Sequence, residues 1–286
     1  MNKIKKLRHL FNFFKIDGYI VPKNDEFFGE YVDQRDDRLN FISSFTGSAG
    51  YAIILKNSSY LFIDGRYTLQ AKKESGQFFK IIEIHKEKPS QILLKLKKKL
   101  NLGFDPKLFC EANLLNNFIA KNINFVPINE NLIDKIWKNK PVFKIKKFFL
   151  IKNKFVGENY KNKIEKVCKI LKKIRINKLF ITAPENIAWL LNIRGKDSKF
   201  SPLPYCHAIL DANNKITLIV RHKKIDSKFK KYFKNKVNYV EPSNFNNYID
   251  RIEKKEIFLI DKFTCSYFYK KNYIVGGIIS KPYYNN

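Results

Sequence analysis

The stretch TGSAGYAIILKNSSYLFIDGRYT, residues 46–68, decides the fold of the first half of the chain. Two runs rich in β-branched and aromatic residues, Tyr51–Leu55 and Tyr60–Ile63, flank the polar sequence 56–59, which predicts a β-hairpin. The sequence DGRY then turns the chain into a predicted helix, Thr68–Glu74. A hairpin that leads directly into a helix is typical of a mixed α/β fold.

Helices and strands alternate on both sides of this hairpin. Apolar residues at steps of three and four predict an amphipathic helix over Lys3–Lys15, and a short apolar strand, Tyr19–Val21, follows it. Further along, the pattern predicts a short helix Arg38–Phe45, strand Phe78–Ile84, helix Pro89–Leu100, strand Leu102–Phe104, and helices Ala112–Lys121 and Ile133–Trp137.

The second half of the chain repeats this order of elements. An apolar helical stripe over Ile164–Ile174 precedes a strand, a short helix and a second hairpin. We therefore predict a duplication: two α/β domains of one fold, residues 1–145 and 155–286, each a mixed β-sheet flanked by helices. The elements predicted here are strand Lys178–Thr182, helix Glu185–Leu191, hairpin strands Tyr205–Leu210 and Ile216–Val220, strand Lys236–Val240, helix Phe245–Ile252 and strand Glu256–Ile260.

Composition limits the class of protein. With 286 residues, of which 44% are hydrophobic, the chain can bury two cores. The net charge of +30 comes mainly from lysines spread along almost every predicted helix, as A/T-rich codon usage produces, whereas nucleic-acid binders cluster basic residues with aromatics. Nucleic acid is therefore disfavoured as a partner. No apolar run of about 20 residues and no signal peptide occurs, so we expect a cytoplasmic protein without a membrane partner.

Neither cysteines nor histidines form a metal-binding pattern. The four cysteines are far apart in the sequence, and we expect buried free thiols. The histidines lack zinc-site spacings. We expect His9 and His222 to face solvent and His207 to be packed and hydrogen-bonded.

The acidic pairs Asp25-Glu26 and Asp36-Asp37 are interpreted as solvated loop charges, because adjacent carboxylates point apart and no further oxygen ligand is suitably spaced. Nucleophile elbows and phosphate-binding loops are also missing from the sequence. We therefore predict no catalytic residues in this chain.

Arginine is scarce, with eight residues in all, and two of the eight, Arg66 and Arg194, lie in polar turns. An arginine retained among lysines suggests a planar, bidentate role that lysine cannot fill. An ion pair with a neighbouring carboxylate is an equally good explanation for Arg66 and the better one for Arg194.

Several segments together resemble the aminopeptidase P family, the metallopeptidases that remove an N-terminal residue preceding proline. The match runs in order along nearly the whole chain. It is carried by residues 21–27, 29–31, 35–39, 45–50, 64–67, 131–137 and 187–197.

The resemblance implies two creatinase-type N-terminal domains. In the family, a C-terminal "pita-bread" domain holds two Mn²⁺ or similar ions through two Asp, one His and two Glu, and no position here matches those ligands. The resemblance therefore implies a non-catalytic N-terminal portion, binding no cofactor itself, that shapes access for a peptide with proline second and takes part in a homodimer. It also implies that Arg66 reaches toward the substrate cleft, with Glu30, Tyr31 and Arg194 as weaker candidates for its rim.

Two origins remain open for such a chain. One is a truncated or split product of an Xaa-Pro aminopeptidase gene, whose catalytic part is encoded nearby. The alternative is a free-standing, non-enzymatic binding protein whose basic surface takes an anionic ligand. The nucleotides downstream of the gene distinguish the two.

Overall fold

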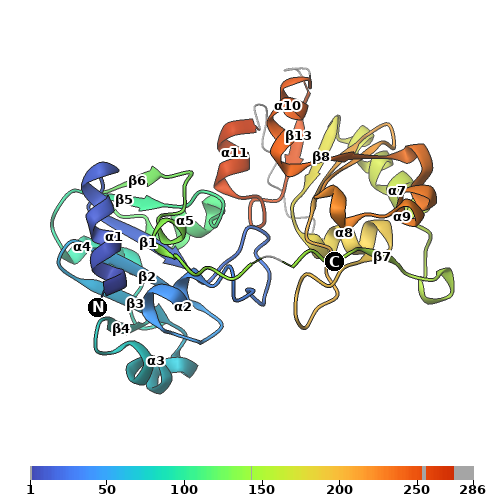
Figure 1. Cartoon of the computed structure of the whole chain (residues 1–286). Helices are drawn as coiled ribbons and strands as arrows, with labels where there is room; N and C mark the ends of the chain where they lie inside the picture. The colour runs from blue at the N-terminus through green and yellow to red at the C-terminus, as the bar shows by residue number, and fades with distance from the viewer. Residues whose placement is uncertain (1, 143, 253–255, 274–286) are drawn as a thin grey trace. The chain divides into compact units, whose positions relative to one another are not determined.

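The computed structural model describes residues 2–142, 144–252 and 256–273. It divides into two compact units, the first comprising Met1–Phe143 and Ser266–Phe268 and the second Lys144–Cys265 and Tyr269–Asn286. Each unit is a mixed β-sheet with helices packed on its faces (Figure 1), which confirms the predicted fold class.

The first unit contains a six-stranded sheet with strand order β4-β3-β2-β1-β5-β6. The predicted hairpin is its β2–β3 pair, and β1 is antiparallel to β2, whereas the β1–β5, β3–β4 and β5–β6 pairs are parallel. The strands are β1 (Gly18–Pro22), β2 (Gly50–Leu55), β3 (Ser59–Ile63), β4 (Lys80–Glu83), β5 (Leu100–Phe104) and β6 (Ile123–Pro127).

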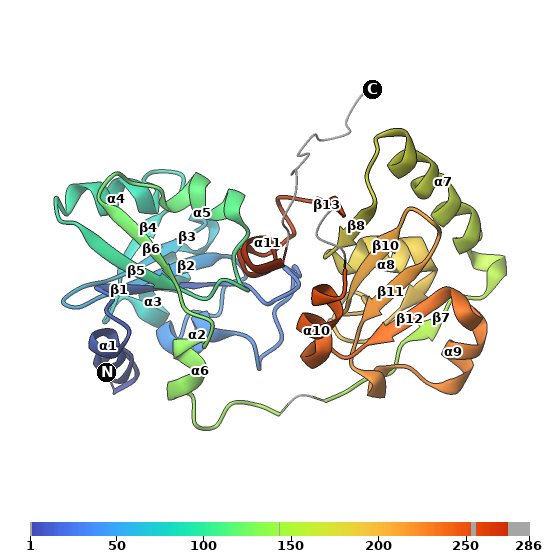
Figure 2. The same cartoon turned by 90° about the horizontal axis from the view of Figure 1, so that it is seen from above.

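Helices cover both faces of this sheet. Alternate residues of β1 separate the two cores: Tyr19 and Val21 pack with α1, α2 and α6, and Ile20 packs with α4 and α5. Figure 2 shows these two groups of helices on opposite sides of the strands. The helices are α1 (Asn2–Phe13), α2 (Arg38–Ser43), α3 (Thr68–Ser75), α4 (Pro89–Lys95), α5 (Glu111–Phe118) and α6 (Leu132–Ile136).

The second unit contains a five-stranded sheet with strand order β12-β11-β10-β8-β13. Helices α7, α8 and α9 pack on one face and α10 packs on the other (Figure 2). The strands are β8 (Lys178–Ile181), β10 (His207–Asp211), β11 (Ile216–Ile219), β12 (Val237–Val240) and β13 (Phe258–Ile260), with a separate small sheet of β7 (Phe149–Leu150) and β9 (Ile193–Arg194). The helices are α7 (Tyr160–Lys173), α8 (Pro184–Leu191), α9 (Ser227–Phe233) and α10 (Phe245–Asp250). Helix α11 (Tyr267–Tyr273) begins with two residues of the first unit and continues in the second.

The two sheets share one plan. Read strand by strand, β12-β11-β10-β8-β13 repeats β4-β3-β2-β1-β5, with the same pattern of parallel and antiparallel pairs. The repeated architecture predicted from the sequence is therefore confirmed. In the described residues, β6 of the first sheet has no counterpart in the second.

Some predicted boundaries were wrong. The helix expected over Pro89–Leu100 ends at Lys95, because Lys97 takes a left-handed backbone conformation (φ 51°) and Leu100 enters β5. The sequence patterns also did not reveal β6, α9 and α11. The terminal stretch Gly276–Asn286, expected to lack regular structure, lies outside the described residues.

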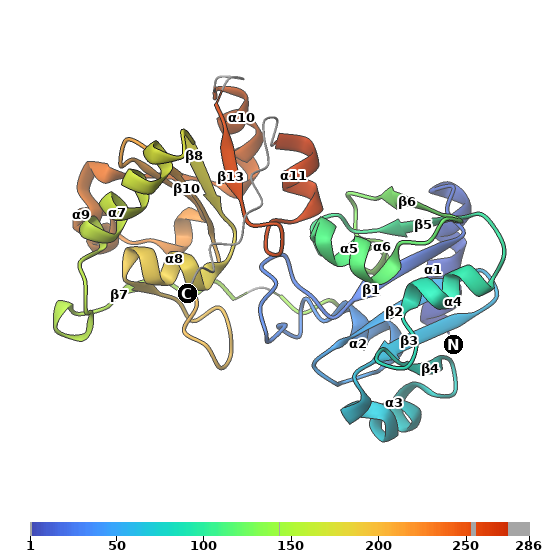
Figure 3. The ribbon, with the colours of Figure 1, turned by 180° about the vertical axis from the view of Figure 1, so that it is seen from behind.

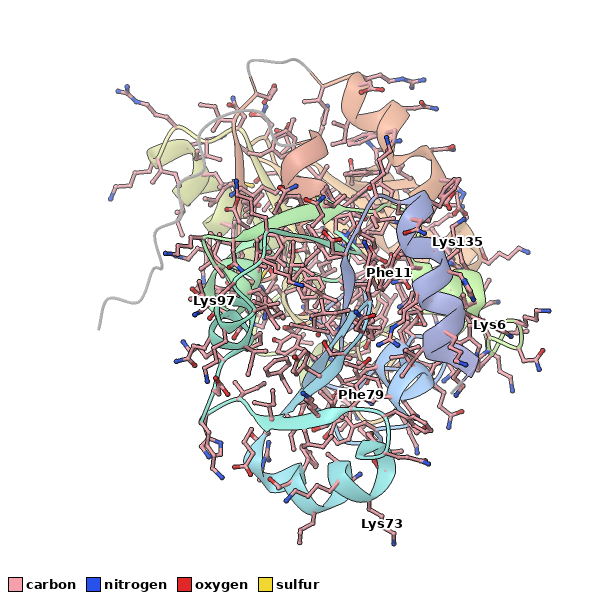
Figure 4. The ribbon with its side chains drawn as sticks, turned by 90° about the vertical axis from the view of Figure 1, so that its left-hand side faces the viewer. Lys6, Phe11, Lys73, Phe79, Lys97 and Lys135 are labelled. Atoms are coloured by element: carbon pink, nitrogen blue, oxygen red, sulfur yellow. The ribbon has the colours of Figure 1, made fainter. Side chains whose placement is uncertain are left out.

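The lysines are scattered over the surface of the first unit. In Figure 4, Lys6, Lys73 and Lys135 project outward from three different helices and Lys97 from the connection between α4 and β5, whereas Phe11 and Phe79 point into the interior. The four cysteines are free and buried, as predicted.

Candidate functional site

Five strands of the first sheet end at one edge. Strands β1, β3, β4, β5 and β6 run in the same direction, so the loops that follow them gather there. We call this side the carboxyl edge. Ligands of open α/β sheets bind preferentially at such an edge. The loops after β1 and β3 bring Glu30, Tyr31 and Arg66 to it, whereas Arg194 belongs to the second unit.

The loop after β1, residues 23–37, is held by a buried carboxylate. Asp25 is only 3% exposed, and its Oδ1 accepts hydrogen bonds from the backbone N–H groups of Phe27 (2.8 Å) and Gly29 (3.2 Å). Burial raises the pKa of the Asp25 carboxyl to about 6. The interpretation of Asp25 as a solvated charge was therefore wrong, because the carboxylate satisfies backbone donors that would otherwise lack partners.

Asp36 and Asp37 also have structural roles. Asp37 caps α2 by accepting from the Asn40 N–H (3.1 Å) and forms an ion pair with Lys23 (2.6 Å). Asp36 lies 3.5 Å from the guanidinium of Arg38, and its burial raises its pKa. Interpreting these two side chains as solvated was wrong, because Asp36 forms an ion pair with Arg38 and Asp37 forms one with Lys23.

Glu30 and Tyr31 follow the turn that Asp25 fixes. The Glu30 side chain is exposed and Tyr31 is 38% exposed. The base of the loop is therefore anchored while these two side chains face outward, an arrangement suited to contacting a ligand or another domain.

Arg66 lies in the turn after β3. The carboxylate of Asp64 accepts from the Arg66 backbone N–H (2.9 Å) and from its Nε (2.9 Å) and Nη2 (3.3 Å). The hydrogen bonds from Arg66 lower the pKa of Asp64. Of the two explanations for Arg66, the structure shows the ion pair with the neighbouring carboxylate. The Arg66 side chain is nevertheless 72% exposed, and its guanidinium carbon lies 5.6 Å from the centre of the Tyr67 ring, so the side chain remains accessible.

The glycine-rich turn before β2 also contributes to this edge. Ser48 Oγ and the Tyr67 hydroxyl are 2.7 Å apart, which joins this turn to the one that carries Arg66. A Cβ on Gly47 would lie 2.2 Å from the Phe45 ring, and one on Gly50 would lie 2.7 Å from the Phe62 carbonyl oxygen. Glycine is therefore required at both positions for close packing, and the turn leads into strand β2, whereas a phosphate-binding loop opens a helix.

Arg194 is bound to backbone. Its Nη1 donates to the carbonyl oxygens of Ala188 (3.0 Å) and Ile193 (2.8 Å), at the end of α8. The pairing with a carboxylate that the sequence favoured for Arg194 is therefore wrong, because its acceptors are backbone carbonyl oxygens, one in the last turn of α8 and one in β9.

Metal-binding groups do not assemble in the described ranges. Among those residues, no group of three or more His, Cys, Asp or Glu side chains is placed to hold a metal ion. His207 is buried, with Nδ1 3.3 Å from the Thr182 carbonyl oxygen, and His9 and His222 are exposed, as predicted. The described residues also contain no helix long and apolar enough to cross a membrane.

Comparisons with known families identify the two sheets. A family model described as the creatinase/prolidase N-terminal domain matches residues 3–136, and a second model with the same description matches residues 139–281. The chain therefore belongs to the creatinase/prolidase N-terminal domain family.

The relatives that match are named as Xaa-Pro aminopeptidases. The chain is 32% identical over 243 residues to Xaa-Pro aminopeptidase 1 of Dictyostelium discoideum, covering 80% of this chain and 39% of the relative. It is 28% identical over 268 residues to the probable Xaa-Pro aminopeptidase P of Coprinopsis cinerea, covering 88% and 42%. The chain thus spans well under half the length of these relatives.

A solved structure shares the fold of most of the chain. It is the X-prolyl aminopeptidase of Caenorhabditis elegans, described as a cytosolic enzyme with a di-nuclear active site. The match has a TM-score of 0.82 at 24% identity and covers 93% of this chain and 47% of the other. Together with the sequence relatives, it confirms the resemblance to aminopeptidase P.

Proposed function

We propose that this chain acts as the non-catalytic N-terminal part of an Xaa-Pro aminopeptidase, with domains at residues 1–145 and 155–286. The observation that carries the proposal is the match of both domains to relatives with that name, of which the chain spans only 39% to 42%. In this role the two domains form part of the wall around a peptide substrate whose second residue is proline, and they contribute a few charged side chains to it. The catalytic groups belong to the remainder of the enzyme.

The catalytic ions belong to that remainder. Two Mn²⁺ or similar divalent ions would supply Lewis-acid chemistry for peptide hydrolysis in that remainder. The donor set of the described residues does not fit such a centre, since no three ligand-type side chains converge there. The description of the nematode relative as having a di-nuclear active site supports this division.

The carboxyl edge of the first sheet is our candidate for the face toward the substrate. Arg66 is the leading contact, because its exposed guanidinium is already oriented by Asp64 and needs little reorganisation to bind a carboxylate or carbonyl group. Glu30 and Tyr31 are secondary candidates on the same edge, and Arg194 is a weaker candidate in the second domain. A homodimer and a cytoplasmic location complete the proposal, the latter supported by the relative described as cytosolic.

A direct assay tests the absence of catalysis. Purified chain is incubated with Mn²⁺ and an Xaa-Pro peptide, and release of the N-terminal residue is measured. We expect no turnover. Robust turnover that survives Arg66→Ala and disappears with a chelator would overturn the proposal.

A chimera tests the positive role. This chain replaces the matched N-terminal portion of the Dictyostelium relative, and kcat and KM for an Xaa-Pro peptide are measured. Arg66→Ala is expected to raise KM about tenfold, with partial recovery in Arg66→Lys, the scale of one charge-assisted hydrogen bond. Lys73→Ala, which removes an exposed charge from α3, is the matched control and should change neither constant. If Arg66→Ala and Lys73→Ala change KM equally, Arg66 does not contact the substrate.

A further inference from the structure

A hollow of about 330 Å³ lies within the second unit. It is formed by the segment 151–158, the first turn of α7 and the end of α8, two helices that lie beside one another in Figures 1 and 3. The walls combine two cations with large apolar side chains. Those on which the inference rests are Phe155, Val156, Glu158, Lys163, Trp189 and Arg194.

Lys163 is a buried lysine in a chain whose lysines are mostly exposed. It is 4% exposed, and its Nζ donates to the Trp189 carbonyl oxygen and to Asn192 Oδ1 (2.6 Å). The same Nζ lies 4.5 Å from the centre of the Trp189 ring. Burying an ammonium group costs free energy, so its position against the wall of the hollow is fixed by specific partners.

Arg194 supplies the second cation. Only Nη1 of its guanidinium is engaged among the described residues, by the carbonyl oxygens of Ala188 in α8 and Ile193 in β9. Nε and Nη2 remain as donors on a planar group whose position is already set. A planar fork of this kind matches the two oxygens of a carboxylate.

The charges of the hollow do not cancel. The carbonyl end of α8 carries an effective charge of roughly −0.5, which offsets only part of two full positive charges. Glu158 is the acidic residue of the lining, and its carboxylate is already paired with Lys166 at 2.6 Å. An anion would therefore be attracted to the hollow.

Two aromatic side chains at the same place are poorly covered. Trp189 is 57% exposed and Phe155 is 71% exposed, and both line the hollow beside the cations. Covering exposed aromatic surface with an apolar group removes it from water, which lowers the free energy. The hollow therefore offers a positive end and an apolar wall to one ligand, at the small end of the size range of ligand sites.

We propose that this hollow binds a small amphiphilic carboxylate, one in which an aromatic or branched apolar group is attached to the carboxylate. The guanidinium of Arg194, with Lys163 behind it, receives the carboxylate, and Trp189 and Phe155 cover the apolar group. This site is additional to the peptidase role, and in it Arg194 serves the hollow of the second unit and not the substrate cleft.

Trp189 provides the measurement. The chain has two tryptophans, so Trp137→Phe leaves Trp189 as the single tryptophan, whose emission is excited selectively above the tyrosine absorption band, and calorimetry on the unaltered chain gives an independent value. Phenylacetate is titrated against four comparisons: acetate, inorganic phosphate, chloride and benzyl alcohol. We expect saturable binding of phenylacetate, about tenfold tighter than acetate or phosphate, and no saturable binding of chloride or the neutral alcohol. Absence of saturation with phenylacetate, or equal binding of phosphate, would overturn the proposal.

Variants locate the site. Arg194→Gln is expected to weaken phenylacetate binding about tenfold and Arg194→Lys about threefold, because lysine keeps the charge and loses the fork. Phe155→Ala alters an exposed side chain that the fold does not need, and should weaken phenylacetate without affecting acetate. Lys169→Gln removes one exposed charge from α7 outside the hollow and is the matched control. If Lys169→Gln and Arg194→Gln weaken binding equally, the loss reflects the net charge of the protein and the assignment of the site is wrong. Unchanged phenylacetate binding in a folded Phe155→Ala protein would also contradict it.

Discussion

The two units build the same sheet but lengthen different connections. In the first, residues 23–37 separate β1 from α2, whereas only residues 182–183 separate β8 from α8. The next connection reverses this relation: residues 44–49 separate α2 from β2, whereas residues 192–206, which include the short strand β9, separate α8 from β10. The strand order tolerates a long loop in either position, because loops run over the surface while the sheet is fixed by its cores.

Each long loop is held by one buried carboxylate, though with different partners. Asp25 accepts two backbone N–H groups of its own loop. Asp197 accepts from the Tyr205 N–H (2.9 Å) and forms an ion pair with Lys224 at 2.8 Å, with side chains 1% and 4% exposed. A duplicated fold can therefore anchor its long loops by different interactions: backbone hydrogen bonds to a buried carboxylate in the first unit, and a buried ion pair in the second. Different substitutions should therefore disrupt the two loops.

The largest effect is expected from Lys224→Met. Removing the cation leaves the Asp197 carboxylate buried without its partner, which costs about 3–5 kcal/mol. The measurement is urea unfolding followed by Trp189 fluorescence, since Trp189 belongs to the second unit.

The neighbour Lys223 is exposed, so Lys223→Met is the control and should leave the unfolding midpoint nearly unchanged. Adding Asp197→Asn to Lys224→Met should recover part of the loss, because the unpaired charge is gone. A loss below about 1 kcal/mol for Lys224→Met would contradict the importance of the ion pair.

The anchor in the first unit is expected to respond to pH. The folded state raises the pKa of Asp25 from 3.8 to about 6, so folded protein holds this proton more tightly than unfolded protein. The contribution to stability is complete below pH 3.8 and is lost as the pH rises through 6. Asp25→Asn retains an acceptor oxygen without the charge, and should stabilise the first unit at pH 7 by up to about 3 kcal/mol, with no gain at pH 3.5.

Urea unfolding at the two pH values, followed by Trp137 fluorescence, measures this difference in the first unit. Asp33→Asn changes an exposed carboxylate of the same loop and serves as the control. If both variants show the same pH dependence as the unaltered chain, burial of Asp25 does not control the stability of the loop.

A third pair of substitutions compares equivalent helix ends. Ser44 after α2 and Asn192 after α8 both have left-handed backbones, with φ of 66° and 54°. Asn192 also accepts from Lys163 and donates to the Glu158 carbonyl oxygen, whereas Ser44 is exposed. Asn192→Gly should therefore destabilise the second unit by about 1–3 kcal/mol, and Ser44→Gly should stabilise the first by up to about 1 kcal/mol. Thermal unfolding of each variant checks the opposite signs, and equal signs would contradict the comparison.

The smallest effect is expected at Arg66. Because its ion pair with Asp64 is exposed to solvent, Arg66→Ala should leave the thermal midpoint within measurement error. A clear drop in the midpoint would show that Arg66 stabilises the turn, and any loss of function in the chimera could then not be assigned to the cleft.

Much of the fold was predictable because apolar periodicity reports burial directly. The hairpins over 51–63 and 205–220 and the stripes of α1 and α7 gave the repeated order of elements. Strand β6 was missed because Ile123–Pro127 is a short edge strand whose partly exposed residues resemble a loop.

The sequence by itself determined the duplicated α/β plan, the class of relatives and the lack of a metal-ligand pattern. Only the tertiary structure decided which polar side chains are buried. Asp25 and Lys163 carry the same chemical groups as many exposed aspartates and lysines of this chain. They are buried because the fold places Asp25 beside backbone N–H donors and Lys163 beside a backbone carbonyl oxygen, and these groups need hydrogen-bond partners. A side chain's exposure depends on what packs over it in three dimensions, so sequence spacing alone could not reveal the anchored loop or the charged hollow.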